Sequence, residues 1–416
     1  MLIQFSGPYQ AEATATIARK LAELDARILD IGQTVMHGTL ALGLLVEDSN
    51  SGALRPTISA LAAELGLDCR FSQPETHSGS PSQPPAACLI TLLGNQITAH
   101  HLSRVLAIVA AHGLDANCIH RPSARLALAD SSPYACVEVK AIWRRPLIGQ
   151  GPGADPLEDA LRAQLLDAAN ELGIDIAFQR DSIYRRNRRL FAFDMDSTII
   201  AGEEIDELAK LAGVGDQVAA ITASAMRGDF EFQESFRRRM ALLKGLPEEQ
   251  VYSLLDRIPL TDGAERLLRT LKALGYKTAI LSGGFTFYAR HLQRRLQIDY
   301  IHANEIEIAN GKVTGQVTGP IVDGPRKAAL LQQIAAHEQL SLEQVVAVGD
   351  GANDLPMLKL AGMGIAFRAK PLVRANAGFA LSHLGLDSLL YLIGVRDSDL
   401  QTLGIPAPTA SQLTRI

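Results

Sequence analysis

LFAFDMDSTII, residues 190–200, begins with four apolar residues that run directly into two aspartates, Asp194 and Asp196. A short, fully apolar run of this kind is typical of a strand buried on both faces of a parallel sheet. Residues that directly follow such a strand lie at its carboxyl end, which is the edge of an open α/β sheet where ligands bind. The stretch therefore predicts a buried strand that brings two carboxylates to a ligand-binding edge.

Two later stretches repeat this pattern of an apolar strand followed by a polar loop with glycine. TAIL, residues 278–281, leads into Ser282, and VVAV, residues 345–348, leads through one glycine into Asp350. We expect the three strands to belong to one doubly wound parallel sheet of the α/β class, in a domain that covers residues 188–396.

The first and second of these strands are separated by a long stretch with helical periodicity. It predicts four short helices that form an all-α cap over the site, at about residues 202–260. Residues 397–416 form a tail with weak periodicity, and the sequence assigns it no role.

The N-terminal part of the chain contains the same order of elements twice. Residues 1–73 predict strand, helix, two strands, helix and strand, and residues 87–182 repeat that order. The segment between them, residues 74–86, is rich in Pro and Ser and predicts an extended linker. We therefore expect two α+β domains of βαββαβ order before the α/β domain.

The composition favours an enzyme of the cytoplasm. The chain has 416 residues, 47% hydrophobic and 20% charged, with a formal net charge of −5. This charge gives no general attraction for nucleic acid, and no apolar run approaches the roughly 18–20 residues that span a bilayer. The N-terminus lacks the pattern of a secretory signal. We expect neither nucleic acid nor membrane as a partner.

Two groups of residues in the N-terminal half suggest no chemistry. A basic cluster near residue 186 is expected to be a solvated connector, because no nucleic-acid-binding context surrounds it. The cysteines form no CxxC pair and are expected to be buried thiols in strands, although their even number also allows disulfides. The cluster and the cysteines are Arg185, Arg186, Arg188, Arg189, Cys69, Cys88, Cys118 and Cys136.

Asp194 and Asp196 suit a reaction at phosphorus. A carboxylate attacks phosphorus competently when a divalent cation offsets the repulsion between the anions. A second acid just beyond it can protonate the leaving oxygen and later activate water. The alternative is a turn with two solvated aspartates.

The second strand and a later helix supply groups that bind phosphate. The hydroxyl of Ser282 and the exposed main-chain N–H of Gly283 can hold phosphate oxygens. Lys327 opens a predicted helix, and its charge can neutralise phosphate and keep a nucleophile ionised. The alternatives are an ordinary turn and a solvated lysine, and the adjacent Arg326 competes for the role of Lys327.

The third loop, VGDGANDLPML, gathers the oxygen ligands that Mg²⁺ prefers. Asp350, Asn353 and Asp354 lie within five residues of one another. The loop is not a dinucleotide-binding motif, because its glycines do not satisfy G-x-G-x-x-G.

The motifs D-x-D-S-T, S-G-G, a helical lysine and G-D-G-x-N-D together resemble those of the haloacid dehalogenase-like phosphatases. Within that superfamily, residues 188–395 are most similar to the phosphoserine phosphatases, as FEFQESFRRRMALLKGLP and LSGGF illustrate. The resemblance implies Asp194 as the nucleophile, Asp196 as the general acid and base, and Mg²⁺ bound by Asp194, Asp350 and the main-chain carbonyl of Asp196. It also implies that phosphate is bound by Ser282, Gly283, Lys327 and Asn353.

The cap is expected to choose the substrate. Glu203 can pair with a substrate ammonium and Arg239 with its carboxylate. Phe232 lies seven positions before Arg239, so one helical face can present both side chains to the cleft. The alternative is a solvated basic face with the phenylalanines in the core of the cap.

The resemblance implies hydrolysis of O-phospho-L-serine to L-serine and phosphate, through an aspartyl-phosphate intermediate, in L-serine biosynthesis. A related small-metabolite phosphatase or a phosphotransferase is an alternative within the enzymes. An amino-acid sensor with an idle catalytic domain is an alternative outside them.

The two βαββαβ domains resemble the ACT domains that bind small regulatory ligands. The resemblance implies an amino-acid effector at the N-terminal domains and a homodimer in which such domains pair edge to edge. The turns after the first strands, Ser6-Gly7-Pro8 and Gly94-Asn95-Gln96, lack the acidic residue followed by glycine that is often found there.

Overall fold

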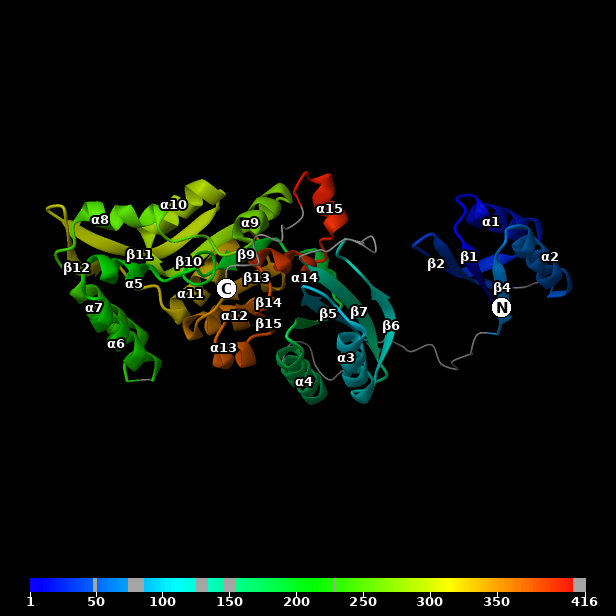
Figure 1. Cartoon of the computed structure of the whole chain (residues 1–416), viewed down its shortest axis with the longest axis horizontal. Coiled ribbons are helices and arrows are strands. Elements are labelled where there is room, and N and C mark those ends of the chain that lie inside the picture. The colour runs from blue at the N-terminus through cyan, green and yellow to red at the C-terminus, as the bar shows by residue number, and fades with distance from the viewer. Residues whose placement is uncertain (48–50, 74–85, 125–133, 146–154, 228, 407–416) are drawn as a thin grey trace. The chain divides into compact units, whose positions relative to one another are not determined.

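The chain forms two compact units, Met1–Gln83 and Pro84–Ile416. The computed structural model describes residues 1–47, 51–73, 86–124, 134–145, 155–227 and 229–406 (Figure 1). Among these residues, no helix is both long enough and apolar enough to cross a membrane.

The first unit is a four-stranded antiparallel sheet with two helices, in the strand order β2-β3-β1-β4. Alternate residues of its central strand β3 are buried, from Leu40 to Val46, because one face of the sheet packs on the helices. Its elements are β1 (Leu2–Pro8), α1 (Ala13–Glu23), β2 (Arg27–Met36), β3 (Thr39–Glu47), α2 (Ser51–Glu64) and β4 (Asp68–Ser72).

The second unit opens with a domain of the same topology, whose strand order β6-β7-β5-β8 matches that of the first unit position by position. Its core is formed by the apolar residues of β5 and by both helices. Its elements are β5 (Ala87–Gly94), α3 (Ala99–Ala111), β6 (Leu114–His120), β7 (Ala135–Trp143), α4 (Pro156–Leu172) and β8 (Asp175–Arg180).

A seven-stranded sheet follows, in the order β12-β11-β10-β9-β13-β14-β15, with β9 at its centre and parallel to both neighbours. Successive residues of β9 enter different cores: Phe191 and Phe193 face one layer, and Leu190 and Ala192 face the other. The strands are β9 (Leu190–Phe193), β10 (Lys277–Phe285), β11 (Tyr300–Ala309), β12 (Lys312–Thr318), β13 (Val345–Gly349), β14 (Met363–Phe367) and β15 (Phe379–Leu381).

Helices cover both faces of this sheet, so the predicted doubly wound architecture is confirmed. Residues of α9 and α10 pack on one face, and residues of α11 and α12 pack on the other. The helices are α9 (Ala264–Ala273), α10 (Thr286–Leu296), α11 (Gly324–His337), α12 (Leu355–Leu360), α13 (Pro371–Asn376), α14 (Leu389–Leu392) and α15 (Asp397–Thr402), with short 3₁₀ turns at Leu342–Gln344, Ala352–Asp354 and Leu386–Ser388.

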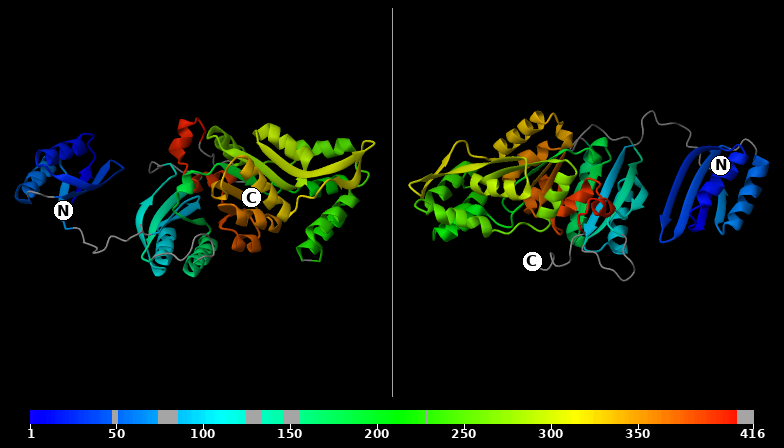
Figure 2. Two further views of the ribbon diagram at one scale, coloured as in Figure 1. Left: turned by 180° about the vertical axis from the view of Figure 1, so that it is seen from behind. Right: turned by 90° about the horizontal axis from the view of Figure 1, so that it is seen from above.

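The predicted helical cap is present between β9 and α9. It joins the sheet through a neck of two antiparallel segments: Ile200 bridges Leu260, and the N–H of Ala201 donates to the carbonyl of Pro259 at 2.9 Å. The cap and the β5–β8 domain lie at opposite ends of the sheet (Figures 1 and 2). The cap elements are α5 (Glu204–Leu211), α6 (Gly215–Met226), α7 (Phe232–Leu242), α8 (Glu248–Tyr252) and a 3₁₀ turn at Ser253–Asp256.

Buried polar groups join the β5–β8 domain to the far edge of the large sheet. The carboxylate of Asp175, at the start of β8, accepts from the main-chain N–H groups of Ser382 and His383, directly after β15. The hydroxyl of Tyr134 donates to Asp387 at 2.8 Å. These bonds explain why the second βαββαβ domain and the α/β domain form one compact unit.

The basic connector differs from the prediction at two positions. The 3₁₀ turn Ile183–Arg186 joins β8 to β9, and its Arg185 is 5% exposed and paired with the buried Glu138. Arg188 is 4% exposed and donates to the carbonyl of Glu343. The expectation of a fully solvated cluster is therefore wrong, because each of these two guanidinium groups has a partner distant in sequence.

The cysteines all lie in strands and are free thiols. Cys88 and Cys136 are buried as expected, whereas Cys118 is exposed on β6 and Cys69 is half-buried. The predicted tail begins with α15, and the buried Asp397 accepts from the N–H of Ala124 at 2.6 Å. The first part of the tail is therefore folded against the β5–β8 domain.

Candidate active site

Three loops converge at the carboxyl edge of the sheet. Strands β10, β9 and β13 are neighbours, with Phe193 paired to Ile280 on one side and to Val348 on the other. The residues that follow these three strands are therefore adjacent in space. The polar loops singled out from the sequence come together at this edge, as the strand pattern predicted.

Asp194 is 5% exposed, and both of its carboxylate oxygens have donors. Oδ1 accepts from the N–H of Met195 at 2.7 Å, and Oδ2 lies 2.7 Å from Nζ of Lys327. Its own N–H donates to the carbonyl of Val348 at 2.9 Å. The residue is held by the central strands, which fixes the direction in which its carboxylate faces.

Lys327 lies in the first turn of α11 and is fully buried. Its Nζ contacts Asp194 and Asp354, each at 2.7 Å. Burial acts to lower the pKa of Lys327, but the two carboxylates outweigh it and raise that pKa above its usual range. The lysine therefore stays charged and keeps a permanent positive charge beside Asp194.

A cluster of carboxylates surrounds this lysine. Oxygens of Asp194, Asp350 and Asp354 all lie within 4.8 Å of one another. Burial, followed by the charges of Asp194 and Asp354, raises the pKa of Asp350 to about 8. This excess of negative charge among oxygen donors fits a divalent cation, which would let all three groups ionise together.

Asp196 lies beside the cluster, with a different environment. Its Oδ1 accepts from the N–H of Glu204 at 3.0 Å. Desolvation, followed by the charges of Glu204, Glu203 and Asp194, raises the pKa of Asp196 well above its ordinary value. A raised pKa favours the protonated form of this carboxyl, which suits the predicted role of a general acid.

The second loop is closely packed. Ser282 is fully buried, and its hydroxyl accepts from the N–H of Gly284 at 2.9 Å. A Cβ at Gly284 would collide with Oε2 of Glu204, so only glycine fits there. The carbonyl of Gly283 accepts from the side-chain amide of Asn304 at 2.7 Å, which fixes this loop to β11.

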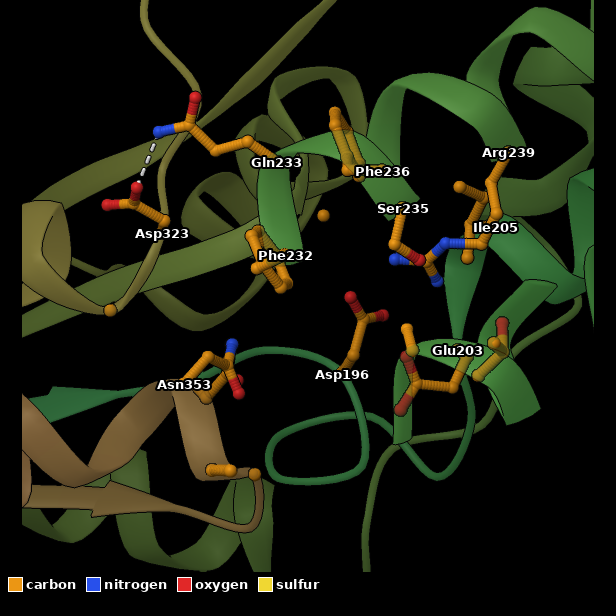
Figure 3. A pocket seen from close by; sticks show the side chains of 18 of the residues that line it. Asp196, Glu203, Ile205, Phe232, Gln233, Ser235, Phe236, Arg239, Asp323 and Asn353 are labelled. Carbon is orange, nitrogen blue, oxygen red and sulfur yellow. Dashed lines mark hydrogen bonds between the residues drawn. The ribbon is translucent and has the colours of Figure 1, made fainter. Parts of the chain in front are cut away.

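A cavity of about 1120 Å³ lies between the cap and the three loops (Figure 3). Ser282 and Lys327 are fully buried behind its wall. Of the predicted site residues, those on the wall are Asp194, Asp196, Glu203, Phe232, Arg239, Gly283, Asp350 and Asn353.

Cap side chains give the cavity both a polar and an aromatic wall. The rings of Phe232 and Phe236 stack at 6.2 Å, with Phe236 buried and Phe232 at the cavity. Desolvation lowers the pKa of Arg239, while the charge of Glu203 acts to raise it. Among the described residues, Nε of Arg239 and the buried hydroxyl of Ser235 have no hydrogen-bond partner, so this wall suits a polar ligand.

Three residues of this site were not singled out from the sequence: Glu204, Asn304 and Ser235. Asp354 was expected among the oxygen ligands of the third loop, and its place in the G-D-G-x-N-D motif was the signal. Glu204, Asn304 and Ser235 gave no such signal, because their positions depend on packing between distant segments.

Comparison with known proteins identifies the family. Residues 191–359 match the haloacid dehalogenase-like hydrolases, and residues 1–72 match the ACT domain. The chain is 38% identical over 418 residues to the phosphoserine phosphatase of Mycobacterium tuberculosis, covering 96% of this chain and 94% of that protein. The chain belongs to the phosphoserine phosphatase family. The phosphoserine phosphatase of Streptomyces coelicolor is also 38% identical, over 96% of this chain and 93% of its own length.

A solved structure supports the same assignment. A haloacid dehalogenase family hydrolase from Salmonella enterica serovar Typhi superposes with a TM-score of 0.62 at 32% identity, covering 74% of this chain and 98% of that one. Membership of the phosphoserine phosphatase family confirms the predictions of a phosphatase with a haloacid dehalogenase-like fold and an N-terminal ACT domain. The roles of the individual site residues remain predictions.

Proposed function

We propose that this chain is a Mg²⁺-dependent phosphatase that hydrolyses O-phospho-L-serine to L-serine and phosphate, in the biosynthesis of L-serine. One observation carries the proposal. The buried pair of Asp194 and Lys327 lies beside a cluster of carboxylates, at the bottom of a cavity whose cap wall carries Arg239 and Glu203.

In the first step, Oδ of Asp194 attacks phosphorus, and the bond between phosphorus and the serine oxygen breaks. Asp196 donates its proton to that leaving oxygen, so L-serine departs neutral at its hydroxyl and Asp194 carries the phosphoryl group. A bound Mg²⁺, held by Asp194, Asp350 and the main-chain carbonyl of Asp196, would offset the repulsion between carboxylate and phosphate. Lys327 balances the remaining charge.

In the second step, Asp196 accepts a proton from water, and the resulting oxygen attacks the phosphorus. The bond from phosphorus to Asp194 breaks, which releases phosphate and restores the carboxylate. Because Asp196 is protonated after this step, it is ready for the next substrate.

The remaining roles follow the chemistry of the substrate. Its phosphate is bound by Ser282, Gly283, Lys327 and Asn353. Its ammonium pairs with Glu203 and its carboxylate with Arg239, while Phe232 covers the site. This arrangement discriminates against phosphomonoesters that lack the amino-acid group, because they leave the half-buried Arg239 without a carboxylate partner.

The experiment is a phosphate-release assay on the full chain, with a panel of phosphomonoesters and with Mg²⁺ present or chelated. We expect phosphoserine to exceed sugar phosphates by about 10²-fold or more in kcat/KM, because a site built for polar groups rejects ligands that lack them. Equal turnover of sugar phosphates would refute the substrate, and activity after chelation would refute the metal.

The N-terminal βαββαβ domains carry a second part of the proposal. They bind an amino-acid effector, act within a homodimer, and belong to a cytoplasmic enzyme. The ACT match at residues 1–72 supports the effector. Calorimetry with free L-serine tests the effector, and light scattering after size exclusion tests the dimer; no heat of binding and a monomer mass would refute them.

A further inference from the structure

A hydrogen bond connects the cap to the core at the mouth of the cavity. Nε2 of Gln233, in the first turn of α7, donates to Oδ2 of Asp323 at 2.6 Å across a separation of 90 residues (Figure 3). Both side chains line the cavity and are half-buried. None of the catalytic roles proposed above uses either residue.

Each polar atom of this contact has its own partner. Nη2 of Arg237 donates to Oε1 of Gln233 at 3.2 Å, which turns the amide so that its nitrogen faces Asp323. Oδ1 of Asp323 accepts from the N–H of Arg326 at 3.0 Å and caps α11. The amide therefore cannot reverse without placing its NH₂ group against the guanidinium of Arg237.

Asp323 is itself fixed to the phosphate-binding loops. Its neighbour Val322 donates to Oδ1 of Asn304 at 2.9 Å, and Nδ2 of Asn304 donates to the carbonyl of Gly283 at 2.7 Å. On the other side, a Cβ at Gly324 would lie 2.7 Å from the carbonyl oxygen of Asn353. The position of Asp323 between the second and third loops is therefore fixed by the contacts of its two neighbours.

The other end of the contact lies beside the substrate-facing ring of the cap. Gln233 directly follows Phe232, and a Cβ built on Gly283 would lie 3.1 Å from Cζ of that ring. Holding Gln233 on Asp323 therefore holds Phe232 over the phosphate loop and sets the position of α7, which also carries Arg239.

We infer that Gln233 and Asp323 form a latch that keeps the cap closed over bound substrate and aligns α7 with the phosphate-binding loops. They are positioning residues, and Arg237 sets the direction of the bond. This inference rests on the proposed function, in which a closed cap excludes water while phosphoserine is bound.

The test exchanges donor and acceptor across the contact. Asp323→Asn keeps the helix cap, because Asn caps as well as Asp, but it turns an NH₂ group toward the NH₂ of Gln233. Gln233→Glu places a carboxylate against Asp323. The double variant, Gln233→Glu with Asp323→Asn, restores a bond of opposite direction, because the carboxylate introduced on α7 then accepts from both Arg237 and the new amide.

We expect each single variant to raise KM for phosphoserine by about tenfold, as the loss of a charge-assisted hydrogen bond implies, and the double variant to recover most of that loss. A matched control is Glu234→Gln, the neighbouring residue on α7, whose exposed carboxylate pairs with Arg238. The control should keep the KM of the unaltered chain. A double variant no better than the singles would overturn the latch.

A second measurement does not depend on the substrate. Hydrogen exchange of the main-chain amides of α7 should accelerate in both single variants and return to its original rate in the double variant. If the unaltered chain does not hydrolyse phosphoserine, the proposed function fails, and this exchange measurement still decides the latch. Unchanged exchange in the single variants would overturn it.

Discussion

Two groups of buried carboxylates in the second unit are arranged in opposite ways. At the junction between the β5–β8 domain and the large sheet, each acid has separate donors: Asp387 accepts from Tyr134 and Arg266, each at 2.8 Å. Asp397 likewise accepts from Tyr391 at 2.7 Å. At the carboxyl edge of the sheet, Asp194 and Asp354 instead share one lysine and also lie close to Asp350. Burial and the charges of these two acids raise the pKa of Asp350.

The difference indicates that the acids at the junction have a structural role and that those at the carboxyl edge have a catalytic one. Acids that have donors of their own and no carboxylate close by fix one arrangement of the chain and need no ligand. Acids that repel one another store unfavourable energy, which a cation and a phosphoryl group can release on binding. The junction therefore stabilises the fold, whereas under the proposed function the edge that carries Asp194 and Asp350 gains stability from the cation and phosphate that it binds.

The largest expected effect is on catalysis. Asp194→Asn should lower phosphate release from phosphoserine by about 10³-fold or more, because the amide is a poor nucleophile. Its thermal midpoint should change little, since the loss of repulsion from the neighbouring carboxylates opposes the loss of the charge that pairs with Lys327. A substantial Mg²⁺-dependent rate of phosphate release in this variant would show that Asp194 is not the nucleophile and would refute the catalytic role of this group of acids.

Next in size is the loss of a satisfied acid at the junction. Asp387→Ala leaves the guanidinium of Arg266 without its carboxylate and should lower the free energy of unfolding by about 3–5 kcal/mol. Denaturant unfolding measures the change, and the specific activity of the folded fraction should be kept. The control Glu265→Ala removes an exposed acid and should change stability by at most about 0.5 kcal/mol.

A smaller effect is expected from metal binding. Adding Mg²⁺ at about one hundred times its Kd should stabilise the chain by about 2.7 kcal/mol, visible as a rise in the thermal midpoint. In Asp350→Asn the rise should shrink, because one ligand is lost. Equal rises in both proteins would show that the cation binds elsewhere.

A further effect concerns the pH dependence of stability without metal. The pKa of Asp350 is about 8 in the folded chain, above its ordinary value of 3.8, so the folded state holds the proton more tightly. Stability from this group is therefore present at low pH and falls as the pH rises from about 4 to 8. Thermal midpoints across this range should decline less in Asp350→Asn, and identical slopes would contradict the assignment.

The sequence predicted the architecture well because the relevant signals are local. Four-residue, mainly apolar strands followed by polar loops, and a helical stretch between the first two, define the sheet, its functional edge and its cap. The same signals brought Asp194, Ser282 and Asp350 to one edge.

The rest depends on contacts between segments that are far apart in the chain. The double pairing of Lys327 with Asp194 and Asp354 follows from how α11 packs on the sheet. Arg185 lies in a run of arginines that is typical of a surface segment. It is nevertheless buried, because it pairs with the carboxylate of Glu138, 47 residues earlier in the chain. The hydrophobic periodicity of a segment does not indicate which distant residue will pair with its charged side chains.

The neck of the cap has a consequence for engineering. Because the chain leaves and re-enters the sheet through two segments that are paired at Ile200 and Leu260, the ends of the insertion are close together. An exchange of the whole insertion at these two points would leave the path of every strand unaltered. The new cap would also have to restore the contacts of Glu204 with Phe285 and of Gln233 with Asp323, because both cross from the insertion to the core.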